Sequence, residues 1–341
     1  MKMGIHIVES TSYLSAFDKE LRRRLWWQIR TLDVRIAEDY HVDPMIIEQA
    51  CDTALPTNTD DISLHPDMTA RPPAQQGRTE MLYSIVRFQT SHLALRMVFS
   101  TAICHKNGYE VLSMADKCQR IDRFWDDLEK GLLSHCDTNI PLDFVTVTST
   151  RLVIVKLKLA VCKPRVGERL DMGMRASYRA TCEEVLRHAL VLRQYEKGQQ
   201  WLWLFQTYLE WDALAYLLLD ICLTPGAATT STWTAIENVY EHWKESPDVR
   251  RDQRWENIEE LRQEALTRRQ QAPRAANFQQ HQSSTCGSHE QTDNTYEPAS
   301  TNSWTPDNVD SAMQLSGDGT TSEWDDEALL EQYWQIAGWS E

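Results

Sequence analysis

The sequence predicts an all-α fold: an irregular multi-helix domain followed by a disordered acidic C-terminal tail. Apolar residues recur at helical spacing in several long segments, and no set of alternating strands accompanies them. The composition changes near residue 271, where Gln, Ser, Thr, Asn and Gly become frequent. Such a segment buries too little apolar surface to offset its ordering entropy. We therefore expect a helical body over residues 1–270, and a disordered linker and tail over residues 271–341.

Charge is unevenly distributed along the 341 residues. The net charge is −15, which argues against a general polyanion binder. Residues 271–341 hold twelve acidic residues and one basic residue, net −11, so the first 270 residues carry −15 + 11 = −4. The apolar share of 42% and the charged share of 25% are typical of a soluble globular protein. No segment reads as a signal peptide or as a membrane span, and we expect no membrane partner.

The eight cysteines do not form a metal-binding pattern. They contain no C-x-x-C, and the closest pair is 14 residues apart. The sequence predicts no bound metal and no cofactor, and free thiols in a reducing compartment are the default interpretation.

The first predicted helix spans residues 15–39. Ser15 and Asp18 form an N-terminal capping pair, and Glu20 with Arg24 is spaced for an ion pair one helical turn apart. The apolar positions fall on one helical face, namely Leu21, Leu25, Leu32 and Ile36.

The remaining elements follow in order. A surface loop is expected over 53–78, a long helix over 79–106 and another ending near Gly131. The run at 151–164 fits either a strand or a buried helix. An amphipathic helix ending at Gly198 follows, then a strongly apolar one ending at Pro225-Gly226, and two shorter helices around 231–244 and 254–269.

Catalytic motifs are absent from the sequence. It contains no complete D-D-x-x-D/E, H-E-x-x-H, P-loop, G-x-G-x-x-G or G-x-S-x-G pattern. His92 lies on an apolar helical face, which favours a satisfied core histidine. Cys182 with His188 lacks any context for nucleophilic catalysis. We therefore predict no catalytic residue and no enzyme.

Several ordered motifs resemble the regulatory middle domain of fungal zinc-cluster (Zn2Cys6) transcription factors. The first is E-x-R-R-R-x-W-W-x-x-x-x-x-D, with Arg22, Arg23, Arg24, Trp26, Trp27 and Asp33 in this chain. The second is L-P-x-N-x-x-D, which includes Pro56. A later Y-x-x-W-H-A pattern contains Trp211 but has Asp212 where histidine is usual, and Cys162-Lys163-Pro164 stands in place of H-R-P. The resemblance covers about residues 16–266.

The resemblance implies an all-helical domain used for regulation and partner contact, without catalytic residues. It also implies that the family's N-terminal zinc cluster and the beginning of the middle domain are missing. DNA binding would then be indirect, supplied by a missing zinc cluster or by a partner. A small-molecule effector and a nuclear location are further expectations.

The Arg-Trp run itself fits a structural helix better than a nucleic-acid surface. Three successive side chains on a helix fan out by about 100° each, so they cannot face one ligand together. We interpret the arginines as a solvated rim with one member tied to internal carboxylates, and we expect at least one tryptophan in the core. Asp33 is predicted to be a buried partner of an arginine.

The acidic tail is the segment that the sequence connects most directly with function. Apolar side chains alternate there with carboxylates, as in acidic activation segments that recruit the transcription machinery or co-activators. The residues concerned are Trp324, Leu329, Leu330, Tyr333, Trp334, Ile336 and Trp339. Leu329, Tyr333 and Ile336 share one face if the segment is helical. The alternative is a C-terminal helix that docks back on the body.

Together these observations predict a transcriptional regulator of fungal type that acts by recruitment. One alternative is a scaffold or dominant-negative protein of the same fold without a DNA link, and another is an all-α enzyme. Whether the chain activates or represses, and its oligomeric state, stay open.

Overall fold

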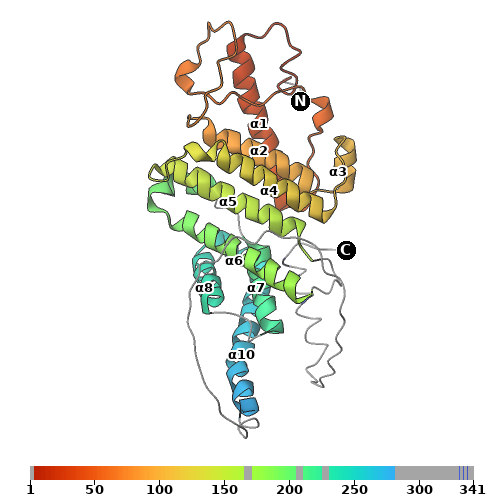
Figure 1. The fold of residues 1–341 in the computed structure, drawn as a ribbon, viewed down its shortest axis with the longest axis vertical. Helices are drawn as coiled ribbons and strands as arrows, with labels where there is room; N and C mark the ends of the chain where they lie inside the picture. Colours follow the sequence, from red (N-terminus) through yellow and green to blue (C-terminus); the bar gives the residue numbers. More distant parts are fainter. Residues whose placement is uncertain are drawn as a thin grey trace, which may run out of the picture.

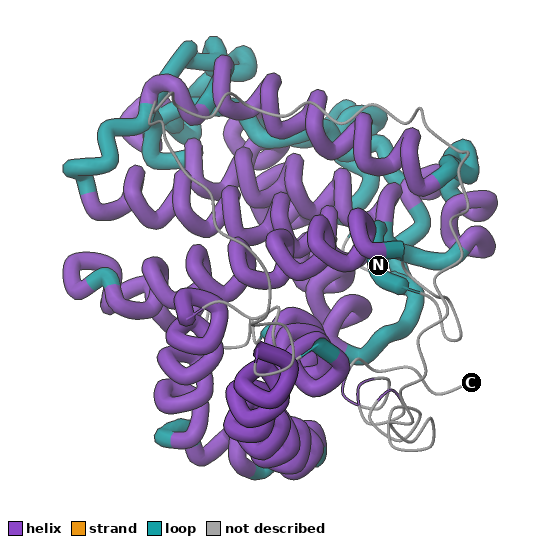
Figure 2. Tube along the Cα trace, turned by 60° about the horizontal axis from the view of Figure 1, so that its bottom comes forward, coloured by secondary structure: helices purple, strands orange, loops and turns teal. Residues whose placement is uncertain are grey.

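A computed structural model describes residues 4–164, 171–204, 210–224 and 230–280, together with the single residues 330, 333 and 336. Within these residues the chain forms helices and no strand (Figure 2). The predicted all-α class is therefore confirmed. The predicted disorder between 281 and 329 lies outside the described residues.

The N-terminal half contains five α-helices joined by loops and short 3-10 turns. The helices are α1 (Ala16–Asp39), α2 (Leu82–Met97), α3 (Thr101–Lys106), α4 (Met114–Lys130) and α5 (Pro141–Val161). The turns are η1 (Glu48–Ala50), η2 (Asp61–Ser63) and η3 (Leu133–His135). Pro141 occupies the first turn of α5, where its missing N–H costs nothing.

The C-terminal half begins with the long helix α6 and ends with α10. Its elements are α6 (Met172–Gln194), η4 (Glu196–Leu204), α7 (Trp211–Leu223), α8 (Thr230–Lys244), α9 (Pro247–Arg250) and α10 (Arg254–Gln280). Helix α7 is buried along most of its length, and α6, α8 and α10 surround it.

The helices stack in successive layers, which Figure 1 shows from top to bottom. Helix α1 packs on α2, α2 packs on α5 beside α4, and α5 packs on α6. One core fills the C-terminal half, and smaller apolar clusters lie between α2, α4 and α5 and beneath α1. No helix of the described residues is long and apolar enough to cross a membrane.

One predicted helix is two in the structure. Residues 79–106 divide into α2 and α3 because Asp43, from the loop after α1, accepts hydrogen bonds from the amide and the hydroxyl of Ser100. Ser100 in turn caps α3 by accepting the amide of Ile103. A contact 57 residues away therefore outweighs the continuous helical spacing.

The leucine spacing identifies one apolar face of α1, and in the structure this face is partly exposed. Leu21, Leu25 and Leu32 are 44, 46 and 44% exposed, while the opposite face buries Trp26 and Trp27. The helix has two apolar faces, and the larger indole rings occupy the core.

In three further segments the structure either decides between the sequence predictions or differs from them. The ambiguous run at 151–164 is helical as part of α5. The apolar segment 199–226 divides into η4 and α7, and α10 continues to Gln280, past the expected end at 269.

Candidate functional site

The buried carboxylate of Glu20 connects α1 with the L-P-x-N loop. Glu20 is 0% exposed. Its Oε1 accepts the amide of Thr57 at 2.8 Å, and its Oε2 accepts the Thr57 hydroxyl and Arg23 Nη1, both at 3.2 Å. Pro56 lies buried directly before Thr57. The two family motifs that were separate in the sequence therefore meet at one carboxylate.

The three arginines have three different surroundings, as the fanning argument predicted. Arg23 is buried and donates two hydrogen bonds of 2.7 Å to the carboxylate of Glu9, and these bonds lower the Glu9 pKa. Arg24 pairs with Asp61 at 2.5 Å and lies 3.7 Å from Glu20, the spacing predicted for an ion pair. Arg22 is half-buried on the neighbouring face. This arrangement fits a structural helix rather than a grip on phosphates.

Both tryptophans of the motif are buried. Trp26 contacts the ring of His6, and Trp27 packs against Phe88 of α2. The Trp27 indole N–H donates to the carbonyl oxygen of Ala54 at 2.9 Å. Trp27 thus fastens the loop to the helix pair α1–α2.

The hydrogen bonds of Asp33 go to backbone amides and not to the predicted arginine, although its charge acts on Arg30 and opposes the lowering of the Arg30 pKa. Its two carboxylate oxygens accept the backbone amides of Met45 at 3.2 Å and Ile46 at 2.9 Å. The loop that follows α1 turns back and brings unpaired amides to Asp33, which therefore fixes the end of that loop.

A cavity of about 350 Å³ opens beside α1. Arg30 donates to Glu48 and lies 2.8 Å from the Nδ1 of His92, and its guanidinium stacks 4.6 Å from the Trp27 ring centre. Desolvation lowers the Arg30 pKa to about 10. His92 is half-buried at the rim rather than deep in a core. The lining residues are Trp26, Trp27, Arg30, Ile46, Glu48, Cys51, Asp52, Thr53 and His92.

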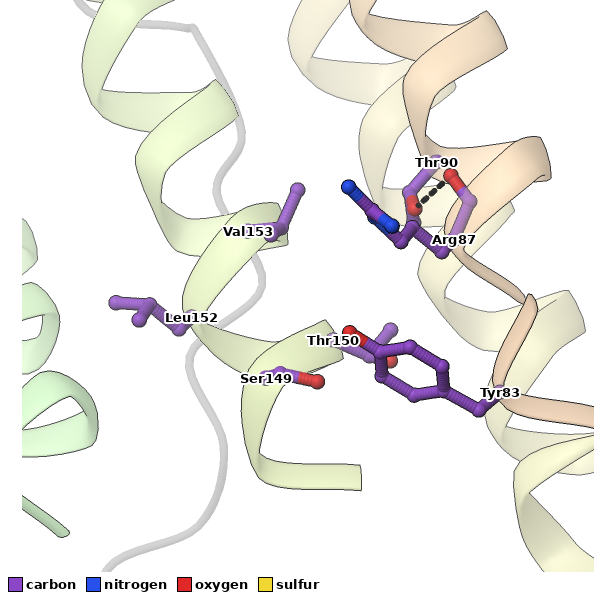
Figure 3. Close-up of a pocket in the computed structure, with 7 residues that line it drawn as sticks. All are labelled: Tyr83, Arg87, Thr90, Ser149, Thr150, Leu152 and Val153. Carbon is purple, nitrogen blue, oxygen red and sulfur yellow. Dashed lines mark hydrogen bonds between the residues drawn. The ribbon is translucent and has the colours of Figure 1, made fainter. Parts of the chain in front are cut away.

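A second pocket, between α2 and α5, is much smaller. Figure 3 shows Tyr83 and Arg87 of α2 facing Thr150 and Val153 of α5. The accessible space is about 30 Å³, enough for about one water molecule. It is too small for a metabolite.

The two departures from the family motifs form an ion pair. Lys163 Nζ lies 2.9 Å from Asp212 Oδ2, which connects the end of α5 to the first turn of α7. Trp211, next to Asp212, is buried against Trp243 with ring centres 4.6 Å apart, and Arg254 lies over its ring. The two departures lie 49 residues apart in the sequence, and no local pattern indicates that they meet.

Three residues of the C-terminal segment are described, and two of them pack against the body. Tyr333 and Ile336 are 1% and 0% exposed, and both belong to the core cluster of the C-terminal half. Leu330 is 38% exposed. Trp324, Leu329, Trp334 and Trp339 lie outside the described residues. At Tyr333 and Ile336 the segment therefore docks on the body, which was the alternative interpretation of the tail.

The receiving surface is the α6/α7 face, which we define by Tyr178 and Cys182 of α6 and Tyr216 of α7. Tyr178 and Tyr216 pack edge to face at 4.5 Å, and Tyr333 lies edge-on to Tyr216 at 6.0 Å. Burial raises the pKa of Tyr333, and the charge of Asp212 raises it further. Three phenol rings thus form one packed aromatic group.

The cysteine and histidine considered for catalysis do not form a reactive pair. Burial raises the Cys182 pKa far above its usual range, and His188 contacts Glu184 at 3.3 Å. Among the described residues, no group of histidine, cysteine and acidic side chains is arranged to hold a metal ion.

Comparison with protein families connects this architecture to transcription. Residues 2–124 match the family model of the fungal specific transcription factor domain. The match contains the α1 motif, the loop that docks on Glu20, the helices α2 and α3, and α4 up to residue 124. The resemblance to the regulatory middle domain of fungal zinc-cluster transcription factors is therefore confirmed, with the family match itself confined to residues 2–124.

Similar proteins extend the likeness over most of the body. The chain is 26% identical over 254 residues to the aurofusarin cluster transcription factor aurR2 of Gibberella zeae, covering 71% of this chain and 37% of that protein. It is 24% identical over 250 residues to the transcriptional regulator AacuB of Aspergillus aculeatus, covering 70% and 33%. Transcription factor macR of Penicillium terrestre is 33% identical over 130 residues, 35% of this chain and 15% of that protein.

The chain spans about a third of the length of the first three relatives that it matches. The comparison with solved structures found no match.

Proposed function

We propose that this chain is the regulatory part of a nuclear transcriptional regulator of fungal type, and that it acts by recruiting partners rather than by catalysis. The family match over residues 2–124 and relatives named as transcription factors support this function. DNA contact would come from a zinc cluster or from a partner protein. The arginines of α1 belong to the fold, because Arg23 and Arg24 are held by carboxylates of the same domain.

The C-terminal segment would be the part that contacts co-activators, and docking on the body would keep it from doing so. The observation that carries this proposal is the burial of Tyr333 and Ile336 on the α6/α7 face. A segment whose apolar side chains are buried on its own body cannot offer them to a co-activator at the same time. Release from the α6/α7 face would expose those side chains among carboxylates, the composition of an acidic activation segment.

A reporter assay tests the recruitment and the masking separately. Residues 300–341 and the full chain are each fused to a foreign DNA-binding domain. We expect strong activation by the tail alone and weak activation by the full chain. No activation by the tail would refute the activation role, and equal activation by both fusions would refute the masking.

The matched variants alter the receiving face and leave the tail intact. Tyr178→Ala in the full-chain fusion removes one ring of the α6/α7 face and should raise activation toward that of the tail alone. Tyr195→Ala is the control, because Tyr195 borders the same core but stacks on Phe144 at 4.0 Å, whereas the ring beside Tyr333 is Tyr216. Equal effects of the two variants would indicate general destabilisation instead of release.

The cavity beside α1 is the place where we propose that a small-molecule effector binds. Its volume of about 350 Å³ lies within the range of roughly 300–1,000 Å³ typical of ligand pockets. Two largely buried indole rings and the Arg30–Glu48 pair line this cavity, so they offer apolar contact and hydrogen bonding to a polar molecule. Binding would change tryptophan fluorescence, and Trp27→Phe should reduce that change. A metabolite screen in which ligands shift the melting temperature of this variant and of the native chain equally would refute the location.

A further inference from the structure

Helices α4 and α5 form an antiparallel pair with a well-defined register. Lys158 of α5 pairs with Asp122 of α4 at 2.6 Å, and Arg151 lies 3.6 Å from Glu129. Glu129 follows Asp122 by seven residues in α4, and Arg151 precedes Lys158 by seven residues in α5, so the two helices run in opposite directions. Figure 1 shows the two helices side by side in the middle layer. Two independent ion pairs therefore fix which side chains face one another.

One further step in the same register brings two cysteines together. Cys118 precedes Asp122 by four residues, and Cys162 follows Lys158 by four. The two sulfur atoms lie 3.4 Å apart, and both side chains are half-buried free thiols. A disulfide bond is about 2.05 Å long, so the two sulfur atoms need to approach by about 1.4 Å to form one.

The two thiols differ in acidity. The Cys118 pKa is lowered to about 7, mainly by the hydrogen bond from the Cys162 thiol and also by the ammonium of Lys158, while burial and the carboxylate of Asp122 oppose the lowering. The same hydrogen bond raises the Cys162 pKa. Cys136 is also half-buried, but burial raises its pKa to about 11. Cys118 is thus the better nucleophile at neutral pH, since the thiolate is the reactive form.

We propose that Cys118 and Cys162 are a peroxide-sensitive pair that forms a reversible disulfide between α4 and α5. The Cys118 thiolate attacks one oxygen of hydrogen peroxide, the O–O bond breaks, and sulfur is oxidised to a sulfenic acid while hydroxide takes up a proton and leaves as water. The Cys162 sulfur then attacks the sulfenic sulfur. The S–O bond breaks, the S–S bond forms, and the Cys162 proton leaves with the hydroxide as a second water. A reducing dithiol reverses the reaction by exchange.

The position of this pair gives the disulfide a structural consequence. Cys162 is the C-cap of α5, and the next residue, Lys163, connects to Asp212 on α7. Asp212 in turn influences the pKa of Tyr333 in the docked C-terminal segment. The disulfide would therefore fasten α4 to the point where the α5 and α7 layers join.

The experiment uses the full chain, reduced and freed of reductant, then treated with hydrogen peroxide below millimolar concentration. Free thiols are blocked with an alkylating agent, and peptides are mapped by mass spectrometry. We expect the Cys118–Cys162 cross-linked peptide as the main product, formed within one chain and removed by dithiothreitol. Absence of that peptide, or a main product joining two chains, overturns the proposal, and neither result depends on a variant.

Three variants assign the roles. In Cys162→Ser, dimedone should label a sulfenic acid on Cys118, because no second thiol resolves it. In Cys118→Ser, Cys162 should react with peroxide at least tenfold more slowly than Cys118 does in Cys162→Ser. Cys136→Ser is the matched control and should form the disulfide at the native rate. Equal dimedone labelling of Cys118 and Cys136 in Cys162→Ser would refute the selectivity, and circular dichroism verifies that each variant is folded.

Discussion

The strongest single test of the docked C-terminal segment is Tyr333→Ala. The Tyr333 side chain is 1% exposed and packs with Tyr178 and Tyr216. Truncating a buried aromatic side chain to alanine typically costs about 3–5 kcal/mol. Since about 1.4 kcal/mol corresponds to a tenfold change in an equilibrium constant, docking should weaken by roughly two to three and a half orders of magnitude. Tyr178 and Tyr216 still pack on each other when the segment leaves, so the body should persist.

Hydrogen–deuterium exchange with peptide resolution measures this release. In the native chain, the amides around 330–336 should be protected, and in Tyr333→Ala they should exchange at the rate of an open chain. Thermal unfolding of the body should change little. Leu330→Ala is the control, because that side chain is 38% exposed and should leave both readouts unchanged.

Two results would contradict the docking and release of the C-terminal segment. If the native segment already exchanges without protection, no docking exists in solution. If Tyr333→Ala lowers the melting temperature of the whole body while the segment stays protected, Tyr333 is an integral core residue and not part of a releasable arm.

Three further predictions concern the body. Glu20→Gln should destabilise the fold by about 3 kcal/mol, because it leaves two arginine contacts without their buried carboxylate, whereas Arg22→Gln should have little effect. A chemical denaturation series measures both, and equal midpoints would contradict the role of Glu20. Alkylation of Cys118 by iodoacetamide should rise with pH to a half-maximal rate near pH 7, since its pKa is lowered to about 7 and the thiolate fraction grows as pH rises through that value. A midpoint near 9 would show an unperturbed thiol. Lys163→Asp and Asp212→Lys should each destabilise the chain, and the double variant should recover about 1 kcal/mol of coupling in a double-mutant cycle. Additive effects would show that the ion pair contributes nothing.

The local features of α1 were predictable from the sequence. Ser15 caps the helix by accepting the amide of Asp18, and Arg24 reaches Glu20 one turn away. These contacts depend on spacing within one helix, which the sequence contains completely. The fanning of the arginines follows from the same geometry, which argues against a joint grip on one ligand.

Features set by contacts between distant segments were not predictable in the same way. Asp33 had arginines within reach along its own helix, but the returning loop supplies backbone amides from Met45 and Ile46 instead. Similarly, two faces of α1 are apolar, and only the position of α2 decides that the indole face is buried. Periodicity identifies a helix and its faces, while the choice of face depends on which neighbour arrives.

The C-terminal segment shows the same division between local and distant information. The spacing of Tyr333 and Ile336 placed them on one helical face, and the structure buries both. The sequence left two occupants open for that face, a partner protein and the chain's own body. The aromatic pair that receives Tyr333 comes from α6 and α7, more than a hundred residues earlier, so no pattern inside the tail could identify it.

The departures from the family pattern gain their meaning from where they meet. Taken singly, Lys163 and Asp212 weakened the resemblance in two places. In the structure they are partners at 2.9 Å, so the two departures together supply an ion pair between the end of α5 and the first turn of α7. Cys162 adjoins one partner, and the charge of the other acts on Tyr333. The proposed redox pair and the docked segment therefore lie at opposite sides of one ion pair. Oxidation of Cys162 or release of Tyr333 could therefore act on the other group through Lys163 and Asp212, the residues in which this chain differs from the family pattern.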